Sequence, residues 1–290
     1  MKYETGKDWR DCAAKRVILF GMSGLGKTHV SQMMRATGEW YHYSVDYRIG
    51  TRYLGEAIDD NLKRVAMREP FLREQLMTDS IFIKSNITFS NLAPVSYYLG
   101  KPGARDKGGL ALEEYRRRQA QFRHAEEQAL LDTGTFIDRA SHLYGYPHFV
   151  CDTGGSFCEW VDPENPEDPI LQALSKDALL VWIKGSPSHT AELIRRFDRA
   201  PKPMAYQPEF LSQTWSQYLN DMNVDAEAVD PDAFIRYAYS RALAHRQPRY
   251  EAIAGNWGVT VTAEDVATAT TPEAFVDLIG AALDIRGAST

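Results

Sequence analysis

The stretch Gly21-Met22-Ser23-Gly24-Leu25-Gly26-Lys27-Thr28 fits the pattern G-x-x-x-x-G-K-[ST] at every fixed position. It follows Arg16–Phe20, a short apolar run that predicts a buried strand, and it leads into a helix-like segment that ends near Gly38. Glycines let successive backbone N–H groups point at one set of phosphate oxygens, and the start of a helix adds its partial positive charge. The stretch therefore predicts a site for the phosphates of a nucleotide.

Each part of this loop has an expected role. The Lys27 ammonium should reach the β- and γ-phosphates, and the Thr28 hydroxyl should ligate Mg²⁺. A chance Gly-rich turn is the alternative, but the strand before the motif and the helix after it favour nucleotide binding. The residues expected at the phosphates are Met22, Ser23, Gly24, Leu25, Gly26, Lys27 and Thr28.

The composition is that of an ordinary soluble globular protein, with 44% hydrophobic and 25% charged residues among 290. A net charge of −6 argues against a general nucleic-acid binder, which usually carries a basic surface. Three cysteines without a CxxC pair argue against a disulfide framework or a zinc ribbon. No apolar run approaches the roughly 18 residues of a membrane span, and the first residues do not resemble a signal peptide. We therefore expect a cytoplasmic protein that binds neither membranes nor nucleic acid.

Strand and helix patterns alternate along the rest of the chain. Further strands are expected at Trp40–Asp46, His148–Asp152, Ala178–Ile183 and Val259–Thr262. Helices are expected at Ala57–Met77, Leu110–Leu131, Ser188–Phe197, Asp232–Ala254 and Pro272–Leu283. Such alternation predicts an α/β fold in which a parallel sheet lies between two layers of helices. Residues 1–54 and 146–290 should form this core, and residues 55–145 a mainly helical insertion after the second strand.

Two aspartates stand where strands are expected to end. Asp46 should lie at the carboxyl edge of the sheet, where a carboxylate can accept or orient the proton of an acceptor hydroxyl. Its alternatives are a helix N-cap or an ion pair with Arg48 or Arg52. Asp152 follows an apolar run and is expected to hold Mg²⁺ through water. Its alternative is a turn-forming aspartate before Thr-Gly-Gly.

Four further segments, in this order, resemble the shikimate-kinase-like small-molecule kinases, a branch of the P-loop NTPases. Ser44–Ile49 is similar to that family's D-x-D-x-x-I, although Ser44 replaces the first aspartate. Asp152–Gly155 is similar to its Gly-Gly turn, and Arg195–Pro203 to its arginine-containing lid. Arg246–Ala254 resembles its R-x-P-x-Y-x-x-x-A helix. The resemblance covers about residues 15–54 and 146–275 and does not extend to the insertion.

The resemblance implies a kinase that uses ATP and Mg²⁺ to phosphorylate a hydroxyl of a small molecule. Because Ser44 lacks a carboxylate, the magnesium-side role is assigned to Asp152. The long insertion implies an acceptor other than shikimate. Arginines of a lid near residues 195–210 would contact the transferred phosphoryl group, with a solvated basic face as the alternative. The residues implied for the lid are Arg195, Arg196 and Arg199, with Arg199 the catalytic one, and those implied for the acceptor are Asp46, Arg48, Arg52, Gly154 and Gly155.

A function of a different class is also compatible with these motifs. The chain would then be an ATP-binding regulator or ATP-hydrolysing switch whose insertion contacts a protein partner. Such a switch would hydrolyse or retain nucleotide without any small acceptor that raises turnover.

Overall fold

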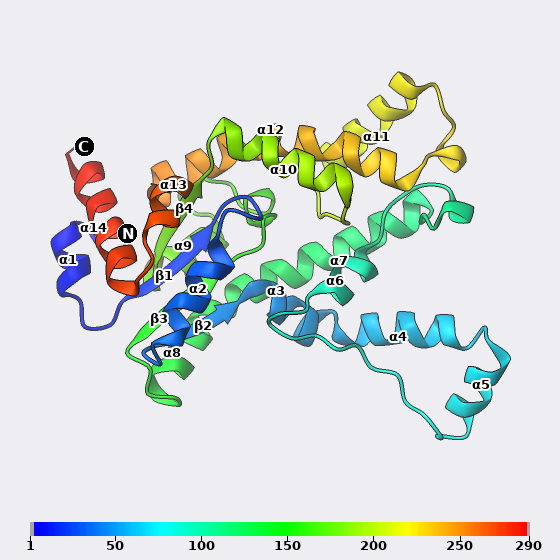
Figure 1. Cartoon of the computed structure of the whole chain (residues 1–290), viewed down its shortest axis with the longest axis horizontal. Coiled ribbons are helices and arrows are strands. Elements are labelled where there is room, and N and C mark those ends of the chain that lie inside the picture. The colour runs from blue at the N-terminus through cyan, green and yellow to red at the C-terminus, as the bar shows by residue number, and fades with distance from the viewer. Residues whose placement is uncertain (1–2, 289–290) are drawn as a thin grey trace. The chain divides into compact units, whose positions relative to one another are not determined.

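A computed structural model describes residues 3–288, and its centre is a parallel sheet of five strands (Figure 1). The strands lie in the order β2-β3-β1-β4-β5. Their bounds are β1 (Arg16–Phe20), β2 (Trp40–Ser44), β3 (His148–Asp152), β4 (Leu179–Lys184) and β5 (Gly258–Thr262). The predicted α/β class and parallel sheet are thus confirmed, and the predicted strand bounds differ from these by at most two residues.

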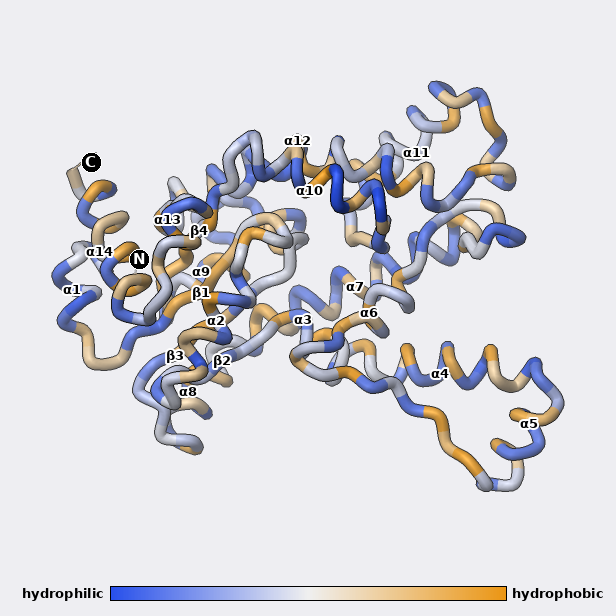
Figure 2. The backbone as a smooth tube through the Cα atoms, viewed as in Figure 1, coloured by the Kyte–Doolittle hydropathy of each residue, from blue (hydrophilic) through white to orange (hydrophobic). Residues whose placement is uncertain are grey.

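Both faces of the sheet are covered, as an all-parallel sheet requires. In the central strand β1, the side chains from Val17 to Phe20 are fully buried, and Figure 2 shows the apolar character of this strand. The helices that contact the strands include α2 (Lys27–Ala36), α8 (Thr133–His142), α9 (Pro169–Asp177), α13 (Ala263–Thr268) and α14 (Pro272–Gly287). Since no side chain of β1 beyond Arg16 reaches solvent, this strand is held rigidly at the point where the glycine-rich loop begins.

The remaining helices complete the chain. In order they are α1 (Gly6–Asp11), α3 (Val45–Arg48), α4 (Gly55–Ala66), α5 (Pro70–Met77), α6 (Ala93–Leu99), α7 (Leu112–Leu131), α10 (Pro187–Arg199), α11 (Pro208–Met222) and α12 (Pro231–Trp257). A π-helical turn covers Ile49–Tyr53, and 3₁₀ turns cover Arg105–Lys107, Phe157–Glu159 and Ala226–Ala228. The single helix predicted over Ala57–Met77 is two helices, because Pro70 lacks the N–H that a continuous helix would need. No helix within residues 3–288 has both the length and the apolar character of a membrane span.

The chain divides into two compact units. The first comprises Met1–Val45, Leu130–Pro201 and Arg236–Thr290, and the second comprises Asp46–Ala129 and Lys202–Ile235. This division differs from the predicted one at three places: residues 46–54 and 202–235 belong with the helical unit, and residues 130–145 belong with the sheet.

Helix α8 belongs with the sheet because aromatic side chains hold it there. Tyr41 and Tyr43 alternate along β2 and so project from the same face. The ring centroid of Phe136, on α8, lies 4.7 Å from that of Tyr43 and 6.4 Å from that of Tyr41. Such aromatic pairs add about 0.5–1.5 kcal/mol each beyond the area that they bury.

Residues 202–235 belong with the helical unit because polar groups of α7 bind their backbone. Gln119 donates to the carbonyl of Met204 at 2.8 Å and accepts from the backbone N–H of Tyr206 at 2.9 Å. The Tyr115 hydroxyl donates to the same Met204 carbonyl at 3.2 Å. Farther along, the backbone N–H of Ala104 donates to the carbonyl of Val229 at 2.8 Å. These bonds join residues that are far apart in the sequence, so no local sequence pattern predicts them.

A buried ion cluster joins the turn after β3 to helix α12. The Glu159 side chain is 0% exposed, and its carboxylate accepts from Arg246 Nε at 2.6 Å and lies 3.2 Å from His245 Nε2. Burial raises the pKa of Glu159, but the hydrogen bond from His245 and the positive charge of Arg246 outweigh that effect and lower it. The stabilisation linked to this carboxyl is therefore present above its ordinary pKa of about 4.3. It is lost as the pH falls through the lower value of the folded state.

We predict that Arg246→Met lowers the free energy of unfolding by about 3–5 kcal/mol, because it leaves the Glu159 carboxylate buried without its main cationic partner. Urea unfolding at neutral pH measures this loss. As a control, Arg195→Met removes a guanidinium that is 67% exposed, and it should change stability by less than about 1 kcal/mol. Equal losses in the two variants would contradict the prediction.

Candidate functional site

The loop between β1 and α2 has the backbone that the motif predicts. Gly21, Gly24 and Gly26 all have positive φ, at 131°, 90° and 97°. A Cβ atom at Gly21 would lie 2.7 Å from the carbonyl oxygen of Ile183, and one at Gly24 would lie 2.8 Å from the Leu193 side chain. The positive φ disfavours larger residues at all three positions, and at Gly21 the neighbouring backbone leaves no room for a Cβ atom.

The variable positions of the loop fall into two groups. Met22 and Leu25 are buried and anchor the loop, whereas Ser23 and Gly24 are exposed. The Gln247 side chain donates to the Met22 sulfur at 3.1 Å. Of the predicted phosphate-site residues, Met22 and Leu25 can therefore offer only backbone groups.

The Lys27 side chain is buried and folds back over its own loop. Its Nζ donates to the backbone carbonyls of Gly21 at 2.7 Å and Met22 at 2.9 Å. These bonds hold a positive charge beside the exposed part of the loop. A charged ligand at this loop would compete with the two carbonyls for the ammonium group.

A hydrogen-bonded triad lies beside the loop. The Thr28 hydroxyl, at the start of α2, donates to Asp152 Oδ2 at 3.0 Å. The other carboxylate oxygen, Oδ1, lies 3.1 Å from His42 Nε2. Asp152 ends β3, so the structure brings together the two residues that the sequence predicts for Mg²⁺. Neither the carboxylate nor the imidazole is more than 7% exposed.

The turn that follows Asp152 packs against the loop. The backbone N–H and the hydroxyl of Thr153 both donate to the carbonyl of Leu19 at 3.1 Å, which ties this turn to β1. A Cβ atom at Gly155 would lie 2.7 Å from the Ser23 hydroxyl oxygen. Gly155 thus lets the turn approach Ser23 of the glycine-rich loop closely, and the methyl group of an alanine would disturb this contact.

The segment of helix α12 that resembles R-x-P-x-Y-x-x-x-A contacts this turn and holds it in place. The Tyr250 hydroxyl donates to the carbonyl of Gly155, and burial raises the pKa of Tyr250 well above its ordinary value. Arg249 donates to the carbonyls of Cys158 at 2.7 Å and Val161 at 2.9 Å. These side chains therefore fix the backbone of the turn after β3.

The prediction that Asp46 ends the second strand is wrong. Strand β2 ends at Ser44, and Asp46 lies in helix α3, half-buried, because the chain turns helical at Val45. Asp46 begins the second unit, which also contains Arg48 and Arg52. The Arg48 guanidinium lies 5.6 Å from the centroid of the Tyr53 ring, and Arg52 is exposed.

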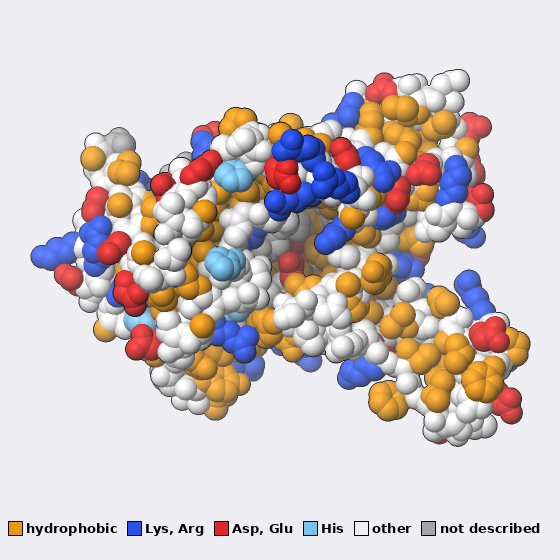
Figure 3. Space-filling view, in the orientation of Figure 1, with side chains coloured by type: hydrophobic (Ala, Val, Ile, Leu, Met, Phe, Trp, Pro, Cys, Tyr) orange, Lys and Arg blue, Asp and Glu red, His pale blue; other side chains and the backbone are white. Residues whose placement is uncertain are grey.

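The predicted lid arginines lie on the exposed side of α10, and Figure 3 shows basic side chains gathered over this helix. Arg195 and Arg196 both donate to the Glu192 carboxylate, at 2.6 and 2.8 Å. The hydrogen bonds from Arg196 and Arg195 lower the pKa of Glu192. Arg199 is exposed at the end of the helix, and no ion pair within residues 3–288 involves it. Two of these three arginines are therefore held on their own helix, and Arg199 is accessible.

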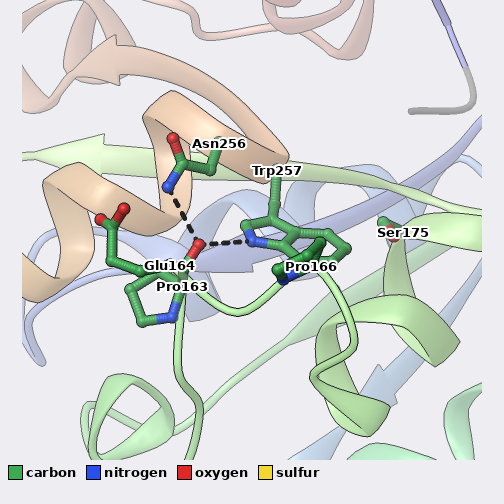
Figure 4. A pocket seen from close by; sticks show the side chains of 6 residues that line it. All are labelled: Pro163, Glu164, Pro166, Ser175, Asn256 and Trp257. Atoms are coloured by element: carbon green, nitrogen blue, oxygen red, sulfur yellow. Dashed lines mark hydrogen bonds between the residues drawn. The ribbon is translucent and has the colours of Figure 1, made fainter.

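A hollow with a volume of about 470 Å³ lies in the first unit. Figure 4 shows Asn256 and Trp257 both donating to the Pro163 carbonyl at its edge, each at 2.9 Å. Trp257 directly precedes β5, and Ser175, which also lines the hollow, comes shortly before β4. Because all five strands are parallel, this hollow lies at their amino ends, whereas the glycine-rich loop follows the carboxyl end of β1. It is therefore separate from the candidate site.

The groups beside the loop could supply only part of the coordination shell of a metal ion. Among residues 3–288 there is no group of three or more His, Cys, Asp or Glu side chains that could enclose a metal ion. One hydroxyl and one carboxylate, Thr28 and Asp152, instead meet beside the loop. Mg²⁺ suits such a site because it keeps several waters and is commonly completed by substrate phosphates.

Comparison with solved structures gives several matches, one of which is a shikimate kinase. The crystal structure of shikimate kinase from Bacteroides thetaiotaomicron is similar to this chain, with a TM-score of 0.41 and 15% sequence identity. The match covers 91% of this chain and 95% of that one. No protein-family model matches the sequence, and no curated protein is significantly similar to it.

Reasoning from the sequence misses His42, whose imidazole contacts Asp152. A signal for it does exist: His42 and Ser44 alternate within Trp40–Ser44, so their side chains share one face of the strand. A polar pair on one face of an otherwise aromatic strand points to a site at the end of that strand.

We predict that Gly155→Ala weakens ATP binding about tenfold, which corresponds to about 1.4 kcal/mol. The added methyl group must displace the Ser23 hydroxyl, and it would also press on the Ser23 backbone nitrogen at 3.3 Å. Isothermal titration calorimetry with ATP and Mg²⁺ measures the change. The control Gly255→Ala places a methyl group where nothing lies within 4 Å on α12, and it should leave affinity unchanged. An unchanged affinity in Gly155→Ala would separate this turn from the nucleotide site.

Proposed function

We propose that this protein is an ATP- and Mg²⁺-dependent kinase that transfers the γ-phosphoryl group to a hydroxyl of a small molecule. The observation that carries the proposal is the meeting of a complete glycine-rich phosphate loop with the Thr28–Asp152 pair. A Gly-rich turn without this pair would account for anion binding but not for binding of a metal ion. The pair adds the hydroxyl and carboxylate that a magnesium-bound triphosphate requires.

In this proposal, the exposed backbone of Ser23 and Gly24 and the N-terminus of α2 receive the phosphates. Lys27 exchanges its bonds to the Gly21 and Met22 carbonyls for bonds to the β- and γ-phosphates. Mg²⁺ would be held by the Thr28 hydroxyl and, through water, by Asp152. When bound, it neutralises charge on the β- and γ-oxygens.

The acceptor side of the proposal involves other residues. We assign Asp46 the role of accepting or orienting the acceptor's hydroxyl proton, because it follows β2 by two residues. Arg48, Arg52 and the Gly154–Gly155 turn are assigned to acceptor binding, and residues 55–145 to enclosing the acceptor. Arg199 is assigned to the transferred phosphoryl group, since a guanidinium binds phosphate oxygens in pairs and neutralises their charge.

The lysine of the loop gives the first test of this proposal. Lys27→Ala should abolish ATP turnover, because the removed ammonium is the main positive charge of the loop. The fold should persist, since the lost bonds go to two carbonyls of the same loop. ADP release and a thermal melting curve without nucleotide measure both effects. Wild-type turnover in a stable Lys27→Ala protein would contradict the assignment of the loop.

The second test separates a kinase from a regulatory ATPase that contacts a protein partner. Asp46→Asn keeps the shape of the side chain and removes its charge. ATP·Mg²⁺ affinity should stay within a few-fold, because the glycine-rich loop supplies the phosphate contacts. Transfer to the acceptor should fall by about 10²–10⁴, the usual contribution of a positioned general base.

The acceptor for this assay comes from a thermal-stability screen of metabolites with a non-hydrolysable ATP analogue. A ligand at 100 times its Kd adds about 2.7 kcal/mol of stability, which shifts the melting curve measurably. If no acceptor emerges and Asp46→Asn hydrolyses ATP as the wild type does, the regulatory ATPase replaces the kinase. If Asp46→Asn melts early and loses both activities together, Asp46 is a structural residue.

A further inference from the structure

The buried imidazole of His42 faces the carboxylate that the proposed magnesium site depends on. The His42 side chain is 2% exposed and that of Asp152 is 7% exposed, and Nε2 lies 3.1 Å from Oδ1. We assign the donor role in this contact to Nε2, because a carboxylate without a proton only accepts hydrogen bonds. With Thr28 on Oδ2, each oxygen of Asp152 has its own protein partner.

The sheet explains why the imidazole reaches this carboxylate. Strands β2 and β3 are parallel neighbours, and the Cα atom of Ser44 is in register with that of Asp152. His42 stands two residues before Ser44 and so projects from the same face of β2. The Ser44 side chain is short, which leaves the longer imidazole to reach the end of β3.

The Asp152 carboxylate beside Thr28 must keep a particular orientation if it is to take part in a metal site. Within the described part of the chain, no group of three or more His, Cys, Asp or Glu side chains could hold a metal ion by itself. The orientation of Asp152 then decides whether Oδ2 stays directed at the Thr28 hydroxyl. The contacts with Thr28 and His42, together with burial, fix the side-chain torsions of Asp152.

We propose that His42 is a positioning residue for the magnesium site: its Nε2–H holds Asp152 Oδ1, and this keeps Oδ2 directed at Thr28. The inference rests on the proposed function, because it concerns the metal of the same ATP site. His42 touches neither the nucleotide nor the transferred group in this proposal. It acts through Asp152, as groups behind metal ligands do in other sites.

The test compares two substitutions at His42. Glutamine carries its side-chain N–H at about the same reach as Nε2, whereas leucine has a similar volume and no donor. Mn²⁺, a spectroscopic substitute for Mg²⁺, is titrated into each protein with a non-hydrolysable ATP analogue and followed by electron paramagnetic resonance. Affinity for the analogue in EDTA is measured as a control that requires no metal.

We expect His42→Leu to weaken Mn²⁺ binding by about 10–100-fold, the usual loss when a group behind a metal ligand is removed. Nucleotide affinity in EDTA should change less than about twofold, because the phosphate loop is untouched. His42→Gln should recover Mn²⁺ affinity to within a few-fold of the wild type. Together these results identify the donated N–H, rather than the buried ring, as the cause.

Two outcomes overturn the inference. One is a folded His42→Leu protein with wild-type Mn²⁺ affinity, and the other is an equal loss in the leucine and glutamine variants. If His42→Leu does not fold, His42→Asn replaces it, because its shorter amide cannot reach Oδ1; equal affinity in the asparagine and glutamine variants then overturns the inference. A wild type whose ATP-analogue complex does not bind Mn²⁺ at all overturns the proposed function as well, so the two failures are distinguishable.

Discussion

The left-handed backbone of the glycine-rich loop is the constraint on which the rest of the site depends. Strand β1 is buried on both faces and must turn into α2 within six residues, from Gly21 to Gly26. The positive φ angles at Gly21, Gly24 and Gly26 make this turn possible at little steric cost. The burial of Met22 and Leu25 then fixes which side of the loop faces outward. The groups proposed to bind phosphate are therefore those on the outward-facing side of the loop.

Much of the surrounding structure holds this loop or the turn after β3 that packs against it. Thr153 ties the end of β3 to β1, Tyr250 donates to the carbonyl of Gly155, and Gln247 reaches the sulfur of Met22. These three contacts come from two elements that are far from the loop in sequence. A site built on such braces is preorganised, so a ligand does not have to order the backbone as it binds. The segment Arg246–Ala254, similar in pattern to a kinase helix, thus has a structural role that its pattern alone does not reveal.

The sequence predicts the sheet well because the buried strands are short apolar runs bounded by glycine, proline or aspartate. The loop itself is predictable for the same reason, since few backbones other than a phosphate cradle need its three glycines. Prediction fails where tertiary contacts decide. The extended pattern of Trp40–Ser44 gives no sign that the chain turns helical at Val45. The sequence therefore predicts a strand that continues to Asp46, two residues beyond its actual end. The alternation of His42 and Ser44 places both on one face of the strand, but it cannot identify Asp152, 110 positions away, as the partner of His42.

The ion cluster of Glu159, His245 and Arg246 has a consequence for how this sequence can change over evolutionary time. Replacing either Glu159 or Arg246 alone leaves a buried charge without its partner, whereas replacing both with apolar residues of similar volume is nearly neutral. Any lineage that exchanges the pair must therefore cross a poorly folded intermediate or change both positions almost together. The two residues should consequently covary among relatives of this chain, as a pair that is either wholly kept or wholly replaced.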